Sequence, residues 1–149
     1  MVLDANVLVR LVAPGEHRQQ AFALWERVSV GREMCVVPAF CPAEVISSIR
    51  QMGRGGMLTG EEEETAARDF VVRIRPGLTV IDSPALTLAA WEIARDLNER
   101  HTYDSVYLAV ARAFGTEFWT TDRQLLSHLA GRFPTARFLG DYPLPPPAP

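Results

Sequence analysis

The chain has 149 residues, of which 48% are hydrophobic and 22% are charged. This length fits one domain with an ordinary core, and the composition excludes the disordered, fibrous and membrane classes of protein. No apolar run approaches the roughly 20 residues that a membrane helix needs. The first residues lack the basic region and the cleavage site of a signal peptide, so we expect a cytoplasmic protein with no membrane partner.

Arginine supplies all 15 basic residues, and lysine is absent. A Walker P-loop, a kinase phosphate clamp and a Schiff-base enzyme each use a lysine amine, so the sequence excludes all three. The two cysteines and three histidines are too scattered for a zinc site, and we expect Cys35 and Cys41 to be free thiols in or near the core. The net charge of −3 argues against a protein that holds nucleic acid by bulk attraction alone.

Strand-like and helix-like patterns alternate along the chain. The predicted strands, which are short and rich in β-branched or aromatic residues, are Val2–Leu3, Met34–Val37, Leu78–Ile81, Glu117–Thr121 and Ala136–Leu139. The predicted helices cover residues 16–28, 42–52, 84–97, 104–114 and 123–130, and one more begins after Thr59, where Glu62 completes a capping box. We expect the glycine-rich stretch 50–59 to be the most flexible internal connection.

The alternation predicts an α/β domain of three layers over residues 1–142, with a central parallel sheet of four to five strands flanked by helices on both faces. Residues 143–149 are mostly proline, which predicts an extended C-terminal tail. Each of the three tryptophans, Trp25, Trp91 and Trp119, lies within an apolar pattern, and we interpret all of them as core residues.

Four acidic residues differ from the acids on predicted solvent-exposed faces. Asp4 and Asp122 follow predicted strands, Glu44 lies in the first turn of a helix, and Asp104 begins another helix. We interpret all four positions as strand-to-helix junctions. In an open parallel sheet these junctions share the edge where ligands bind.

Two polar residues accompany the acids at the same spacing. Asn6 follows Asp4 by two residues, and Thr120 precedes Asp122 by two. If the backbone is extended at these points, each polar side chain points the same way as its acid.

Carboxylates gathered in a crevice repel one another by roughly 1–4 kcal/mol per pair at about 4 Å. Either a shared proton or a hard divalent cation would offset this repulsion. Oxygen ligands without histidine or cysteine favour Mg²⁺ or Mn²⁺, ions that suit phosphoryl chemistry. Each acid also has a simpler explanation, because Asp104 and Asp122 suit helix N-caps and Glu44 suits the helix dipole, whereas Asp4 at a buried strand end does not.

Four segments resemble, in order, the four motifs of PIN-domain nucleases. They are Leu3–Arg10, Pro42–Val45, Tyr103–Ala111 and Thr120–Leu125, and the likeness runs from Met1 to about Leu139. The size of the chain and the Asp-x-Asn opening are most similar to VapC-type toxins of toxin–antitoxin pairs. The resemblance implies a three-layer fold, a magnesium- or manganese-dependent ribonuclease, a cognate antitoxin and a homodimer.

The resemblance also implies roles for single residues. Asp4, Asp104 and Asp122 would hold the metal, and Glu44 would be a further metal ligand or a base, so that all four are expected catalytic residues. The remaining positions that match polar residues of the family would orient the carboxylates or the attacking water, and they are Asn6 and Thr120.

An acidic site attracts RNA only if cations lie nearby. The arginines that flank the motifs are Arg10, Arg50, Arg54 and Arg123, and we expect contacts between them and the RNA.

Two other functions compete with the nuclease. One is a catalytically silent PIN-like module that binds protein or RNA. The other is a haloacid-dehalogenase-like phosphatase with Asp4 as nucleophile. The phosphatase would have a second acid two residues later and a lysine further on, so Asn6 and the absence of lysine oppose it.

Overall fold

The structure is a computed structural model, and it describes residues 1–144; the predicted tail at 143–149 lies almost wholly outside the described residues. Its strands are short and all pair in parallel. They are β1 (Val2–Leu3), β2 (Cys35–Pro38), β3 (Leu78–Ile81), β4 (Phe118–Thr120) and β5 (Ala136–Phe138). The prediction of four to five parallel strands is confirmed, with ends shifted by one residue in three of the five.

The strands form two hydrogen-bonded groups, β1-β4-β5 and β2-β3. The backbone N–H of Val36 in β2 donates to the carbonyl of Met1 at 2.9 Å, which places β2 beside β1. The two groups therefore lie next to each other, and one interrupted sheet replaces the continuous sheet that the sequence predicts. In a parallel sheet the carboxyl ends of all strands meet at one edge.

The helices account for most of the chain. They are α1 (Ala5–Val12), α2 (Arg18–Ser29), α3 (Cys41–Arg54), α4 (Gly60–Asp69), α5 (Pro84–Leu97), α6 (Tyr103–Phe114) and α7 (Arg123–Leu129). A π-helical segment (Phe70–Ile74) and two 3₁₀ segments (Arg75–Gly77 and Leu139–Asp141) complete the regular structure. Within residues 1–144 no helix has both the length and the apolar character needed to cross a membrane.

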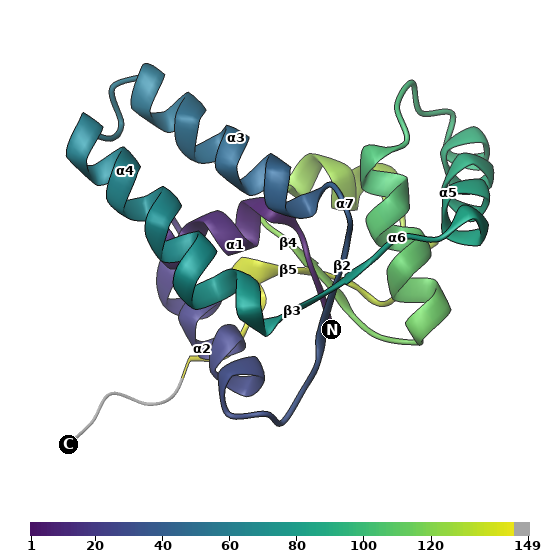
Figure 1. Cartoon of the computed structure of the whole chain (residues 1–149). Helices are drawn as coiled ribbons and strands as arrows, with labels where there is room; N and C mark the ends of the chain where they lie inside the picture. Colours follow the sequence, from purple (N-terminus) through teal and green to yellow (C-terminus); the bar gives the residue numbers. More distant parts are fainter. Residues whose placement is uncertain (145–149) are drawn as a thin grey trace.

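Helices cover the sheet from both sides. The α6 helix packs against β1, β2 and β4, and α5 packs outside α6. The α1 helix contacts β4, α2 and α3, and α3 in turn packs on α4. In Figure 1 the strands cross the middle of the molecule, with α1 to α4 on the left and α5 and α6 on the right. This three-layer arrangement confirms the predicted fold class.

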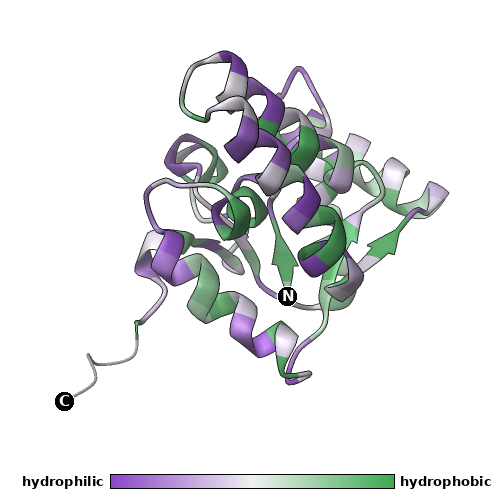
Figure 2. Cartoon of the chain, turned by 60° about the vertical axis from the view of Figure 1, so that its left-hand side comes forward, coloured by the Kyte–Doolittle hydropathy of each residue, from purple (hydrophilic) through white to green (hydrophobic). Residues whose placement is uncertain are grey.

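The core lies where these layers meet the sheet. Val2, Leu3 and Phe118 of the central strands and Tyr107 and Leu108 of α6 are all at most 1% exposed. In Figure 2 the first strand is coloured hydrophobic and lies inside helices whose outer parts are hydrophilic. Cys35 and Cys41 are free and buried, as predicted.

Three local predictions are wrong. The backbone turns helical at Ala5, so Asn6 does not continue an extended strand. Helix α3 runs to Arg54, which shortens the predicted flexible connection to residues 55–59. Trp91 is 50% exposed, because it lies on a face of α5 that is open to solvent, where the guanidinium of Arg95 lies 4.8 Å from the indole centroid.

Candidate active site

Asp4 is the buried centre of the acidic edge. It follows β1 directly and forms the N-cap of α1, with only 8% of its surface exposed. Its Oδ2 accepts hydrogen bonds from Asn6 Nδ2 and from Thr120 Oγ1, each at 2.7 Å. The prediction that Asn6 and Asp4 point the same way is correct in outcome, but a helical turn and not an extended strand brings them together.

Thr120 connects the ends of the first and fourth strands. Its side chain is fully buried at the end of β4, and its Oγ1 accepts from the backbone N–H of Asp122 at 3.0 Å. Asn6 spans the same gap, because its Oδ1 accepts from the backbone N–H of Thr121 at 3.1 Å. Asp4 and Asp122 are therefore held by one shared network across two adjacent strands.

Glu44 is half-buried in the first turn of α3. Its Oε2 accepts a hydrogen bond of 2.6 Å from the hydroxyl of Tyr107, a residue of α6. Burial raises the pKa of Glu44, the Tyr107 hydrogen bond opposes the rise, and the charge of Asp104 adds to it. The tyrosine was not among the predicted site residues, since its apolar surroundings in α6 indicate a core position.

Asp104 lies in the first turn of α6, but α6 follows α5 and not a strand. The interpretation of this position as a strand-to-helix junction is therefore wrong. Thr102, not Asp104, is the N-cap of this helix. The pKa of Asp104 is raised by burial and by the nearby charges of Glu99 and Asp122.

Glu99 is a fifth acid near the edge, and sequence reasoning missed it. Its Oε2 accepts from the hydroxyl of the fully buried Ser105 at 3.1 Å. It lies in the loop after α5, outside every recognised motif, and no pattern in the sequence marks it.

Asp122 caps the last helix. Its Oδ1 accepts from the backbone N–H groups of Gln124 at 2.7 Å and Leu125 at 2.9 Å. The simpler explanation for this residue, an N-cap, is thus correct. Capping employs Oδ1 alone, and it leaves Oδ2 available for the site.

The four carboxylates interact electrostatically. Burial raises the pKa of Asp4 to about 7, hydrogen bonds from Thr120 and Asn6 oppose the rise, and the charges of Asp104 and Glu44 add to it. Among the described residues none of the four acids forms a salt bridge. A cluster of negative charge with no protein cation beside it favours either protonation or a bound metal ion.

The donor set suits a hard cation. Asp4, Glu44 and Asp122 are each fixed through one carboxylate oxygen, and the other oxygen has no hydrogen bond shorter than 3.4 Å within residues 1–144. Oxygen ligands of this kind are those that Mg²⁺ and Mn²⁺ take in proteins. The side chains are near one another without converging, since no three His, Cys, Asp or Glu residues of the described chain stand close enough to share an ion.

The four arginines differ in where they lie. Arg10 is one helical turn from Asn6, and both line a cavity of about 250 Å³ between α1 and α3. Arg50 instead pairs with Glu63 of α4 at 3.0 Å. Arg54 ends α3, about 15 Å along the helix from Glu44 at 1.5 Å per residue.

Arg123 is the first residue of α7, and its guanidinium lies 3.6 Å from the ring centroid of Phe138. Arg10 thus shares a cavity with Asn6, the residue that holds Oδ2 of Asp4.

Solved structures with the same fold are found. The structure of PAE2754 from Pyrobaculum aerophilum matches with a TM-score of 0.67 at 19% identity, over 93% of this chain and 87% of that one. FitAB bound to the IR36 DNA fragment matches with a TM-score of 0.67 at 17% identity, over 99% of both chains. At these identities the likeness establishes the fold alone.

The chain is also similar to known proteins in its amino-acid sequence. Ribonuclease VapC3 of Mycobacterium tuberculosis is 30% identical over 142 residues, which cover 94% of this chain and 92% of the relative. The PIN domain family matches residues 1–131, a span that includes all four acidic positions and sets the phosphatase alternative aside. The chain belongs to the PIN domain family.

Proposed function

We propose that the protein is a divalent-metal-dependent endoribonuclease that hydrolyses RNA phosphodiester bonds. The observation that carries this proposal is the buried Asp4, which the charges of Glu44 and Asp104 affect, while Asp104 is affected in turn by Asp122, with no salt bridge to any of the four among the described residues. Membership of the PIN domain family and similarity to a ribonuclease support it. In the proposed site Asp4, Glu44, Asp104 and Asp122 hold Mg²⁺ or Mn²⁺.

The chain's own residues prepare this site. Asn6 and Thr120 hold Oδ2 of Asp4, so that Oδ1 is the oxygen left for a ligand. Tyr107 holds Oε2 of Glu44, so that Oε1 is the oxygen left for a ligand. When bound, a divalent cation lowers the pKa of water and offsets the charge that develops on the phosphate. Glu44, with a raised pKa and a free oxygen, would serve either as a further ligand of the ion or as the base that accepts the proton of the attacking water.

Arg10 is the arginine that we assign to the RNA backbone. Its cavity adjoins Asn6 and includes Ser48, one helical turn beyond Glu44. Its Nε is buried without a hydrogen-bond partner among the described residues, and Nη1 donates only to Pro14 at 3.3 Å. A phosphate oxygen would satisfy such a guanidinium. We also propose Arg54 and Arg123 as RNA contacts, whereas Arg50 already has Glu63 as a carboxylate partner.

The similarity to VapC3 also supports the toxin of a toxin–antitoxin pair, with a cognate antitoxin as partner and the cytoplasm as its place of action. We propose a homodimer as well, because α5 exposes Leu88 at 58% and Trp91 at 50%, and exposed apolar groups of this size are typical of contact surfaces.

The decisive experiment is cleavage of a mixed single-stranded RNA by purified protein with Mg²⁺ or Mn²⁺, beside EDTA. We expect cleavage by the natural chain that is lost in EDTA and in Asp4→Asn and Asp104→Asn. The matched control is Asp69→Asn, because Asp69 is paired with Arg73 on the surface and lies outside the site. No cleavage by any antitoxin-free preparation, together with no metal binding by calorimetry, would favour the silent binding module.

A further inference from the structure

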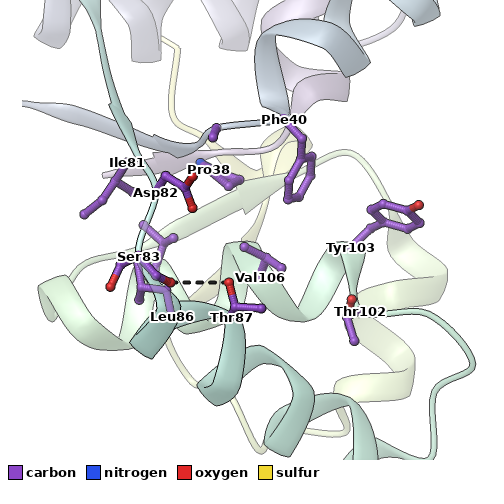
Figure 3. Close-up of a pocket in the computed structure, with 12 residues that line it drawn as sticks. Pro38, Phe40, Ile81, Asp82, Ser83, Leu86, Thr87, Thr102, Tyr103 and Val106 are labelled. Atoms are coloured by element: carbon purple, nitrogen blue, oxygen red, sulfur yellow. Dashed lines mark hydrogen bonds between the residues drawn. The ribbon is translucent and has the colours of Figure 1, made fainter.

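An apolar cavity of about 230 Å³ opens beside the acidic site. It lies between the ends of β2 and β3 and the starts of α5 and α6, and the apolar part of its wall is formed by Pro38, Phe40, Ile81, Leu86, Tyr103 and Val106. In Figure 3, Phe40 and Tyr103 stand on one side of the cavity, and Ser83, Leu86 and Thr87 on the other. We call it the apolar cavity.

The apolar cavity and the acidic site share their supporting helices. Tyr103 immediately precedes Asp104 in the first turn of α6. Phe40 is the N-cap of α3, and its carbonyl accepts from the backbone N–H of Glu44 at 3.1 Å. A ligand in the apolar cavity would therefore lie beside a ligand that is held between Glu44 and Asp104.

Aromatic rings line the cavity at the starts of α3 and α6, the helices that carry Glu44 and Asp104. The ring of Phe40 makes edge contacts with Tyr103, at a centroid distance of 5.8 Å, and with Tyr107, at 5.6 Å. Tyr103 is 60% exposed, so one face of its ring is open to a ligand. Unpaired RNA bases are held by stacking on aromatic rings of this kind.

The polar groups of the cavity suit a base better than a phosphate. No arginine lines it, and Asp82 is the one charged residue of its described wall. Ser83 and Thr102 occupy helix N-cap positions without making the capping hydrogen bond, so their hydroxyls are available. A carboxylate repels phosphate but accepts hydrogen bonds from the amino group of a base.

We propose that the apolar cavity binds one unpaired nucleobase of the RNA, the base next to the phosphate at the acidic site. Tyr103 and Phe40 contact the base, and Asp82 selects bases with an exocyclic amino group, which are guanine, adenine and cytosine, over uracil. The volume is below that of most small-molecule sites and suits a single base. This inference rests on the proposed ribonuclease function.

Binding measurements with two RNA probes distinguish contacts to the base from contacts to the backbone. The full chain with Asp4→Asn, which prevents cleavage, is titrated in Mg²⁺ with a fluorescent cytidine octamer and with an octamer of abasic ribose phosphate. We expect Tyr103→Ala to weaken binding of the cytidine octamer about tenfold and to leave the abasic octamer unaffected. Tyr103→Phe keeps the ring and should bind as its parent does. Val72→Ala, which removes an exposed apolar side chain of the π-helical segment, should change neither affinity.

Three results overturn the inference. The first is an unchanged cytidine affinity in Tyr103→Ala, which is also the result if the cavity takes a side chain of a protein partner. The second is an equal loss for both octamers. The third is a parent that binds neither octamer. The proposed ribonuclease function is judged separately, from metal-dependent cleavage by the natural chain, so the two failures are distinguishable.

The role of Asp82 is tested by a second measurement, the base preference of cleavage. After cleavage of a mixed-sequence RNA, the sequenced product ends should show depletion of uracil at a single position beside the cut. Asp82→Asn should remove that depletion, since an amide both donates to and accepts from a base. A lower rate with the same base preference would refute the role of Asp82.

Discussion

The hydroxyl of Tyr107 donates a 2.6 Å hydrogen bond to Oε2 of Glu44, and so connects the core of α6 to the acidic edge of the sheet. Tyr107 is 1% exposed and does not reach the substrate, so we regard it as a positioning residue. Hydrogen bonds to charged groups contribute about 1.5–3 kcal/mol. We expect Tyr107→Phe to fold normally and to lower kcat at least tenfold, in a cleavage assay with saturating metal.

The pH dependence of kcat distinguishes a positioning role of Tyr107 from simple packing in the core. The Tyr107 hydrogen bond lowers the pKa of Glu44, so its removal raises that pKa. Since Glu44 acts in its ionised form, the acidic limb of kcat should move to higher pH in Tyr107→Phe. Tyr103→Phe removes an exposed hydroxyl from the same helix and is the control. An unshifted limb would mean that Tyr107 does not act through Glu44.

Thr120 carries a second prediction, because its one hydroxyl serves Asp4, Asn6 and the backbone of Asp122. Thr120→Val keeps the shape and deletes all three hydrogen bonds. We expect a loss of about 1–3 kcal/mol in the free energy of unfolding and roughly 10–100-fold weaker Mn²⁺ binding by calorimetry. Thr79→Val, at an exposed position of β3, should change neither. Undiminished metal affinity in Thr120→Val would show that Asp4 needs no such orientation.

The sequence predicts the acidic edge better than it predicts the elements around it. The capping box formed by Thr59 and Glu62 is confirmed, because both of its hydrogen bonds are local. Helix α1 was missed because Val7, Val9 and Val12 favour strands, although its two polar residues, Asn6 and Arg10, lie one turn apart on one face. Tertiary packing decides that segment, and local propensity does not.

The partners of the acids were harder still to predict. Tyr107 reaches Glu44 across 63 residues, and no local pattern records such a contact. Asn6 was matched to Asp4 by spacing, yet a helical turn makes their contact. Residue types and order thus indicated which acids interact with one another, whereas the groups that orient them depend on how α1, α3 and α6 meet at the sheet.

Asp4 makes the stability of the metal-free protein depend on pH. Its pKa is about 7 in the folded chain and 3.8 ordinarily, so the folded state binds the proton more tightly. The contribution of protonated Asp4 to the free energy of unfolding is fully present below pH 3.8 and is lost as the pH rises through 7. About three pKa units correspond to about 4 kcal/mol at most.

We therefore expect Asp4→Asn to be more stable than the natural chain at pH 8 in EDTA, and to differ little at pH 4, by denaturant unfolding. Mn²⁺ should raise the stability of the natural chain at pH 8 and not that of the variant. Asp69→Asn is again the control. If Asp4→Asn is no more stable than the natural chain at pH 8, ionisation of Asp4 does not destabilise the folded chain. Asp4 then gives no support for a bound cation.

Arg10 and Arg50 form a matched pair for testing RNA contacts, since both are predicted RNA contacts but, among the described residues, only Arg50 of the two forms a salt bridge with a carboxylate. Arg10→Gln should weaken binding of single-stranded RNA to the Asp4→Asn chain and reduce the slope of log Kd against log salt by about one phosphate contact. Arg50→Gln should leave the slope unchanged and alter the free energy of unfolding by at most about 1 kcal/mol, because its pair with Glu63 is exposed. Equal slopes in both variants would remove Arg10 from the RNA path, and a reduced slope in Arg50→Gln alone would place the RNA along α3 and α4 instead.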